Sequence, residues 1–183
     1  TVAQHTESGA GMYVAMKDLE IRGAGNILGT EQSGSIAGVG FDLYVRMVGE
    51  AVRELKGDQS AAQEVETKVE LPINAHIPHD YVPGERLRLE AYRRIAEVAS
   101  EDDIAAIREE LLDRYGEPPQ PVDNLLAVAR FRVLARSAGL TDVVLQGTQI
   151  RFAPVELRES QQLRLRRLYP KAVVKAATRT LMV

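Results

Sequence analysis

Between residues 65 and 77 the side chains alternate, with Thr67 and six apolar residues at the odd positions from Val65 to Ile77. Alternation of this kind places successive side chains on opposite faces of a β-strand. The pattern therefore predicts a strand over 65–77 with one buried face. Pro72 and Pro78 cannot donate to a ladder of backbone hydrogen bonds, so we expect the strand to lie at a sheet edge or to break at these prolines.

Apolar residues at helical spacing follow this segment. Pro83 and Gly84 indicate a turn, and a helix is predicted over 85–99. Ser100 and Asp103 have the spacing of a capping pair for a second helix, which Gly116 ends. The apolar stripe of the second helix is Ile104, Ile107, Leu111 and Tyr115.

A third helix is expected from about Pro121 to Gly139, since proline is favoured in the first turn of a helix and glycine just after its end. Its inward positions are Val122, Leu125, Leu126, Ala129 and Val133. Gly147 and Thr148 between two short apolar runs predict a hairpin over 143–152. A helix over 155–168 and two short β-type runs, at 173–174 and 181–183, complete the pattern.

The region before residue 65 has a different character. Residues 22–40 contain Gly23, Gly25 and four further glycines, which indicates a long loop. Apolar residues at helical spacing from Phe41 to Leu55 predict a helix after it. We therefore expect three segments, 1–57, a linker over 58–64, and a domain over 65–183. The fold class predicted is α+β, a small mixed sheet with helices packed on it, preceded by the glycine-rich loop and helix.

Composition limits the chemistry that is available. The chain of 183 residues has no cysteine, which excludes disulfides, thiolate metal sites and a cysteine nucleophile. No apolar run approaches the roughly 20 residues that span a bilayer, so we expect a cytoplasmic protein without membrane contact. Net charge is −2 over 1–57, −7 over 58–116 and +6 over 117–183, which is compatible with a partner or with the regions packing together. With a pI of about 5.7, the chain as a whole lacks the basic charge that is typical of a nucleic-acid-binding domain.

Several familiar site patterns fail. The spacing of Gly23, Gly25 and Gly29 does not match a dinucleotide fingerprint, and the loop has no P-loop ending. His76, His79 and Asp80 have a ligand-like spacing, but His76 falls on the polar face of the predicted strand, so a solvent-facing pair is preferred to a metal site. No serine lies in a nucleophile-elbow context. We therefore expect no catalytic residue, cofactor or metal site in this chain.

The run from Asp18 to Gly34 resembles the translocation motif shared by RecG-type DNA helicases and the bacterial transcription-repair coupling factors. The later stretches 39–44, 69–72, 89–96 and 110–116 resemble only the coupling factors. The resemblance extends over about residues 10–145. It implies the C-terminal fragment of an ATP-dependent DNA translocase that displaces stalled RNA polymerase and couples transcription to nucleotide excision repair. The alternative is an autonomous DNA-binding or helicase accessory domain of a RecG-like protein.

The resemblance also assigns roles to residues. Arg22, Gly23, Gly25 and Gln32 belong to the translocation motif, at the tail of a motor lobe. ATP and Mg would be cofactors of the parent protein, and the fragment, without ATP-binding motifs, is not expected to be an enzyme. Duplex DNA and RNA polymerase would be partners through the parent.

For residues 65–183 the resemblance implies an autoinhibitory lid. The lid would cover the UvrA-docking surface of a UvrB-like module in the same protein, in competition with UvrA. On the second predicted helix, Glu110, Asp113 and Arg114 project away from the apolar stripe, at about 100° per residue. They are the candidate contacts with the UvrB-like module, and a solvated helix flank is the alternative.

Overall fold

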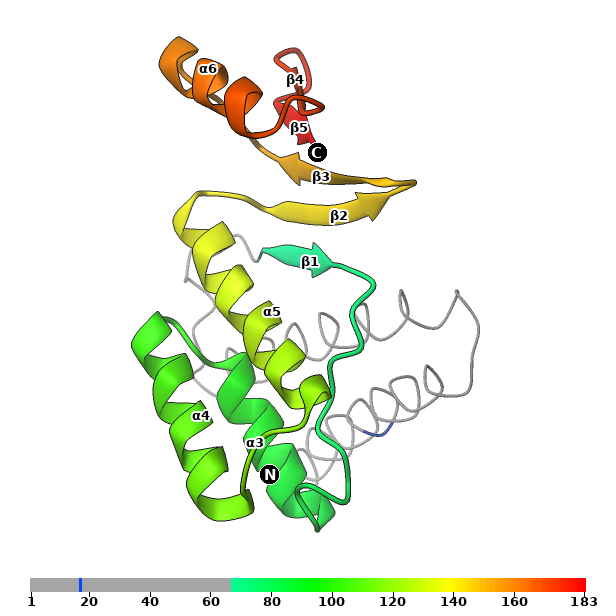
Figure 1. Ribbon diagram of the computed structural model, residues 1–183, viewed down its shortest axis with the longest axis vertical. Helices are drawn as coiled ribbons and strands as arrows, with labels where there is room; N and C mark the ends of the chain where they lie inside the picture. The colour runs from blue at the N-terminus through cyan, green and yellow to red at the C-terminus, as the bar shows by residue number, and fades with distance from the viewer. Residues whose placement is uncertain (1–16, 18–66) are drawn as a thin grey trace, which may run out of the picture.

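The computed structural model describes Lys17 and residues 67–183, which form three helices packed together, a five-stranded sheet, and a fourth helix (Figure 1). The strand order is β1-β2-β3-β5-β4, with β1 parallel to β2 and every other pair antiparallel. The elements are β1 (Lys68–Glu70), α3 (Glu85–Ala96), α4 (Glu101–Tyr115), α5 (Gln120–Ser137), β2 (Asp142–Gln146), β3 (Gln149–Ala153), α6 (Glu159–Leu168), β4 (Val173–Lys175) and β5 (Thr180–Met182). The α+β class with a small mixed sheet is confirmed.

The predicted glycine-rich loop, the helix that follows it, the linker over 58–64 and the first two residues of the predicted strand lie outside the described residues. So do Arg22, Gly23, Gly25 and Gln32. The described part begins, Lys17 aside, inside the domain expected over 65–183.

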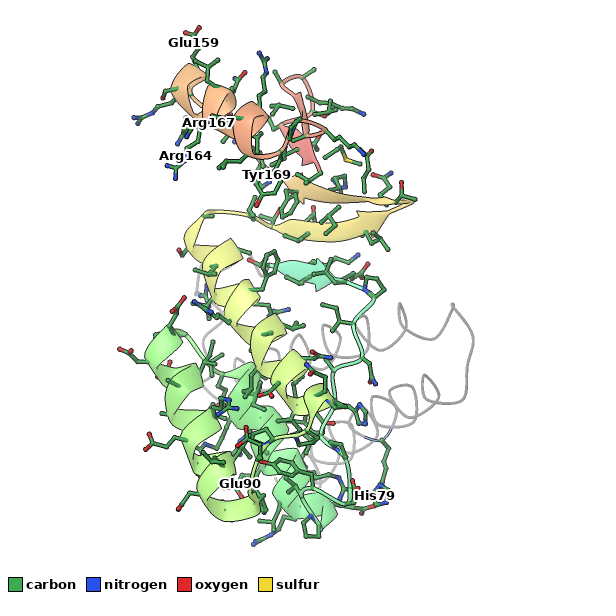
Figure 2. The ribbon with its side chains drawn as sticks, viewed as in Figure 1. His79, Glu90, Glu159, Arg164, Arg167 and Tyr169 are labelled. Atoms are coloured by element: carbon green, nitrogen blue, oxygen red, sulfur yellow. The ribbon has the colours of Figure 1, made fainter. Side chains whose placement is uncertain are left out.

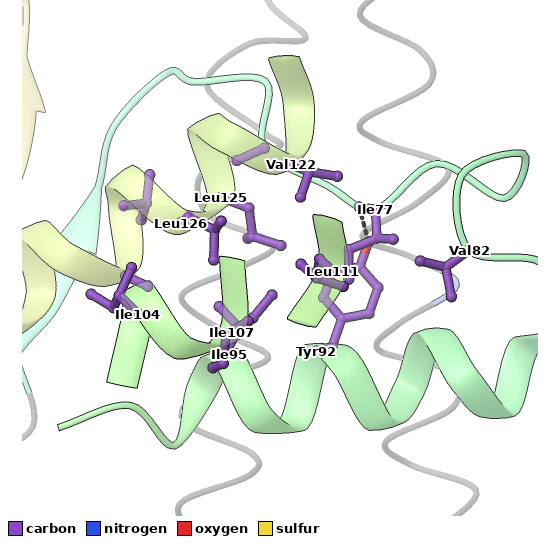
Figure 3. Close-up of a cluster of buried hydrophobic side chains, with 13 residues drawn as sticks. Ile77, Val82, Tyr92, Ile95, Ile104, Ile107, Leu111, Val122, Leu125 and Leu126 are labelled. Carbon is purple, nitrogen blue, oxygen red and sulfur yellow. Dashed lines mark hydrogen bonds between the residues drawn. The ribbon is translucent and has the colours of Figure 1, made fainter. Parts of the chain in front are cut away.

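The main core lies among α3, α4 and α5 (Figure 3). Tyr92 of α3 is fully buried at its centre, and its hydroxyl oxygen accepts a hydrogen bond from the backbone N–H of Ile77 at 2.7 Å. The predicted stripes supply most of this core, since Ile104, Ile107 and Leu111 of α4 are buried together with residues of α5. The buried residues that α5 contributes are Val122, Leu125, Leu126, Val128 and Ala129.

A second, smaller cluster joins the sheet to the C-terminal part of α5. Val69 of β1, Val143 of β2 and Ala135 of α5 are buried in it. Thr67 is also buried and donates a hydrogen bond from its hydroxyl to the Leu140 carbonyl at 2.8 Å. The sheet is thus attached at the end of α5, while α3 and α4 lie beside the other part of that helix (Figure 1).

The long strand predicted over 65–77 is wrong in extent, because regular pairing covers only Lys68–Glu70. After Pro72 the chain leaves the sheet and runs along the helices. There the backbone N–H of His76 bonds to the Pro121 carbonyl at 3.3 Å, and that of Ile77 bonds to Tyr92. Helix contacts therefore replace the ladder that the prolines interrupt.

The prediction that His76 faces solvent is also wrong. The residue is 5% exposed, and its Nδ1 lies 3.0 Å from Oδ1 of Asn74, whereas His79 and Asp80 are exposed as expected. Ala75 and Ile77 on either side of His76 are buried as well, so the two-residue alternation ends here. A segment enclosed by helices on more than one side has no polar face.

Two predicted helices are shorter than expected. The first ends at Ala96 and not at 99, because the next three residues form the connection that brings Ser100 to the start of α4. The last begins at Glu159 and not at 155, because the backbone N–H of Val155 bonds to the Arg179 carbonyl at 2.7 Å. In both places the residues would be helical by propensity alone, but contacts with other parts of the chain hold them outside the helix.

The third helix and the hairpin are confirmed. Pro121 lies in the first turn of α5, and Gly139 follows the helix with φ of 75°, a conformation that favours glycine. Gly147, with φ of 65°, lies in the tight turn between β2 and β3. The two predicted β-type runs become β4 and β5, which pair with each other.

Candidate functional site on helix α4

A reciprocal cap fixes the start of α4. The backbone N–H of Asp103 donates to the Ser100 hydroxyl at 3.2 Å, and the Asp103 carboxylate accepts from the backbone N–H groups of Ala99 and Ser100 at 3.0 and 3.1 Å. The bond from Ala99, followed by those with Ser100, lowers the pKa of the Asp103 carboxyl. Since Ile104, Ile107 and Leu111 are buried, the cap and the core together fix the rotation of the helix and the direction of its outer residues.

Glu110 lies at the boundary between α4 and α3. Its carboxylate accepts hydrogen bonds from Nη1 of Arg94 on α3 and from Nη1 of Arg114 on α4, the latter at 3.3 Å. The bond from Arg94 lowers the pKa of the Glu110 carboxyl, and Arg114 adds to the effect. The Glu110 carboxylate is therefore engaged by the neighbouring helix, and its role as a contact for a partner stays a prediction.

Arg114 has two contacts within the domain. Besides its pairing with Glu110, its guanidinium carbon lies 5.2 Å from the centre of the Tyr115 ring, a cation–π distance. Tyr115 meets Tyr81 edge to face at 5.8 Å, and the Tyr81 hydroxyl lies 2.9 Å from the Gly116 carbonyl oxygen. The C-terminal end of α4 is thereby held by aromatic packing, with Arg114 covering it.

Asp113 is the one of the three predicted residues that points only to solvent. It is exposed, and it forms no hydrogen bond or ion pair within the part of the chain that the structure describes. Around it a shallow depression is lined by Ala106, Glu109, Glu110, Leu112 and Asp113. We call these five residues the outer face of α4.

Sequence reasoning missed Glu109 and Leu112. Leu112 is 39% exposed, although it is a large apolar residue. The available signal was that Leu112 falls outside the stripe of Ile104, Ile107 and Leu111, so a helical projection already places it away from the core. An exposed leucine beside the three carboxylates of Glu109, Glu110 and Asp113 is suited to a basic partner with an apolar patch of its own.

The described residues offer neither a metal site nor a membrane-spanning helix. Lys17 and residues 67–183 contain no group of three histidine or acidic side chains that could hold a metal ion. Among the same residues, no helix has the length and apolar character that a membrane span requires.

Comparisons with known proteins agree with this fold. The structure is similar to a solved C-terminal domain of a transcription-repair coupling factor, with a TM-score of 0.52 and 22% identity, over 64% of this chain and 78% of that one. A family model for the TRCF domain matches residues 71–166, which include α3, α4, α5 and the hairpin. The domain is therefore a TRCF domain in class and in fold.

Curated relatives give the family. The chain is 50% identical over its whole length to the transcription-repair-coupling factor of Mycobacterium tuberculosis, and 40% identical over 74% of its length to that of Bacillus subtilis. The chain belongs to the transcription-repair-coupling factor family. This confirms the resemblance found in the sequence and favours it over the RecG-like alternative. The chain spans 16% of the length of the first of these relatives and 12% of the second.

Proposed function

We propose that this chain is the C-terminal part of an ATP-dependent DNA translocase that displaces stalled RNA polymerase and couples transcription to nucleotide excision repair. Membership of the transcription-repair-coupling factor family supports the proposal. Arg22, Gly23, Gly25 and Gln32 would couple ATP hydrolysis in the parent protein to movement on duplex DNA. The chain would supply no ATP or Mg site of its own and would not hydrolyse ATP alone.

Within that protein, the domain over 65–183 would act as an autoinhibitory lid. It would pack on a UvrB-like module and cover the surface at which UvrA docks. The observation that carries this proposal is the outer face of α4, where Asp113 and Glu109 have no ion pair among the residues that the structure describes and lie beside the exposed Leu112. A rigid, capped helix presents these groups in a fixed geometry, which is what an intramolecular interface of modest size requires.

The three predicted contacts would have different parts in the lid. Asp113 is available for a charge-assisted hydrogen bond to a basic residue of the module, whereas Glu110 already accepts two bonds within the domain. Glu110 and Arg114 would then hold the flank in shape and would add to the contact only at its edge. Truncating Asp113 should accordingly open the lid with little effect on the fold.

The test is UvrA binding by the full-length protein that carries this sequence. Removing one partner of a charge pair that is buried in an interface costs about 2 to 5 kcal/mol. A closed population of about 99% falls to one half when about 2.7 kcal/mol is lost, so a loss in the upper part of that range leaves the lid mostly open. We expect Asp113→Ala to raise UvrA affinity and to leave the melting temperature of the isolated chain unchanged. Asp102→Ala, an exposed acidic residue in the first turn of the same helix, is the matched control and should change neither quantity. Equal UvrA affinity in Asp113→Ala and in the unaltered protein would contradict the proposed contact of Asp113 in the lid.

A further inference from the structure

The last 29 residues contain a concentration of positive charge that the lid does not use. Residues 155–183 include seven lysines and arginines and two glutamates, a net charge of +5 in a chain whose total is −3. One of the two glutamates, Glu156, is already paired with Arg179 at 2.8 Å. The segment therefore has an excess of cations that its own carboxylates cannot neutralise.

Helix α6 carries the densest part of this charge. No residue of the helix is buried, and Arg164, Arg166 and Arg167 form no hydrogen bond or ion pair within the described residues. Several arginines of the α3, α4 and α5 helices behave differently. Arg108 pairs with Glu117 at 3.0 Å, and Arg130 pairs with Glu101 at 3.1 Å.

Two of the three arginines of α6, Arg164 and Arg167, lie on one side of the helix, and Arg166 lies away from them. At about 100° per residue, Ser160, Arg164 and Arg167 fall within about 60° of one another, and Leu163 and Leu168 flank them. Arg164 and Arg167 leave the same side of α6, and Tyr169 follows the helix with 55% of its surface exposed (Figure 2). Leu163 and Leu168 are 62% and 56% exposed. We call Ser160, Leu163, Arg164, Arg167 and Leu168 the outer face of α6.

We propose that the outer face of α6 binds the phosphate backbone of a nucleic-acid duplex without sequence preference. A central row of arginines and a hydroxyl matches a row of phosphates, because the planar guanidinium donates two parallel hydrogen bonds to phosphate oxygens. The flanking leucines can cover the apolar sugar edges on either side of that row. Lys171 and Lys175 extend the positive potential beyond the helix, which suits a long polyanion better than a single acidic side chain.

The proposal goes beyond the lid and uses none of its residues. It also agrees with the acidic pI, since a local patch on an acidic chain produces weak binding, with Kd on the order of 10⁻⁴ to 10⁻⁶ M at physiological salt. Unchanged UvrA binding would contradict the lid, whereas unchanged duplex binding would contradict the duplex site. The two proposals can therefore fail separately.

The experiment measures binding of the 183-residue chain to a fluorescent duplex DNA, and to an RNA duplex of the same length, between 50 and 200 mM salt, a range in which phosphate contacts dominate the change in affinity. Arg164→Gln with Arg167→Gln should weaken binding about tenfold at low salt and reduce the slope of log K against log salt by about 2. The matched control is Arg108→Gln with Arg130→Gln, which removes the same charge from arginines that are already paired, and it should bind within about twofold of the unaltered chain. Circular dichroism establishes that each variant is folded.

Several outcomes would overturn the proposal. Equal weakening by the two double variants would show that only net charge matters, and no weakening by either would place any duplex binding elsewhere in the chain. Binding to poly-glutamate as tight as to the duplexes would assign the face to an acidic protein. Binding to vesicles with anionic lipid but not to duplexes would assign it to a membrane, and salt-sensitive self-association without duplex binding would assign it to a second copy.

Discussion

Replacing Tyr92 with phenylalanine removes one oxygen atom from the centre of the helical core. Tyr92 is fully buried, and its hydroxyl accepts the backbone N–H of Ile77, which is also fully buried. Phenylalanine preserves the ring and its apolar contacts, so packing changes little. The backbone N–H of Ile77 then has no acceptor, and the surrounding side chains keep water from reaching it.

An unsatisfied buried donor costs about 1 to 3 kcal/mol. The bond is short, at 2.7 Å, and it attaches the irregular segment after Pro72 to α3, so we expect a value in the middle of that range. With a urea slope of about 2 kcal/mol per molar, typical of small domains, a loss of about 2 kcal/mol lowers the unfolding midpoint by about 1 M.

The assay is urea unfolding of the chain followed by far-ultraviolet circular dichroism, since the sequence has no tryptophan to report by fluorescence. Tyr169→Phe is the matched control, because Tyr169 is largely exposed and its hydroxyl forms no hydrogen bond in the described residues. An unchanged midpoint for Tyr92→Phe, with an unchanged slope, would refute the reasoning. It would mean that the Ile77 N–H finds another acceptor without cost.

Two further predictions concern the ends of helices. The pKa of Asp103 is lowered from 3.8 by the Ala99 and Ser100 bonds, so its cap contribution is complete above that value and is lost as the pH falls through the lower folded pKa. The difference in urea midpoint between the unaltered chain and Asp103→Ala should therefore shrink as the pH is lowered from 7 to the lowest pH at which the chain still folds. A difference that stays constant over this range would contradict the cap. Gly139→Ala should destabilise the chain by about 1 to 2 kcal/mol, because the backbone at this position has φ of 75°, which strains any residue with a Cβ. An added Cβ would meet no atom within 4 Å, so a steric clash does not contribute. An unchanged melting temperature in thermal unfolding would exclude the strain.

The helices were predictable from the sequence because their signals are local. The stripe of Ile104, Ile107 and Leu111 and the cap at Ser100 lie within one short segment and agree with each other. The irregular segment after Pro72 was not predictable for the opposite reason. Alternation from Val65 to Ile77 describes a strand equally well as an extended chain enclosed by helices, and the bonds that decide the matter come from Tyr92 and Pro121, far along the sequence.

The candidate site on α4 was half predictable. A helical projection gives the direction in which Glu110, Asp113 and Arg114 leave their own helix, but it contains nothing about the side chains that a neighbouring helix places there. Arg94, sixteen residues earlier, engages Glu110, and no spacing rule connects them. The consequence for the lid is specific. Because Glu110 is bonded to Arg94 of α3, and Arg114 is occupied by Glu110 and the Tyr115 ring on its own helix, an intramolecular partner that contacts the outer face of α4 has Asp113, Glu109 and Leu112 to recognise.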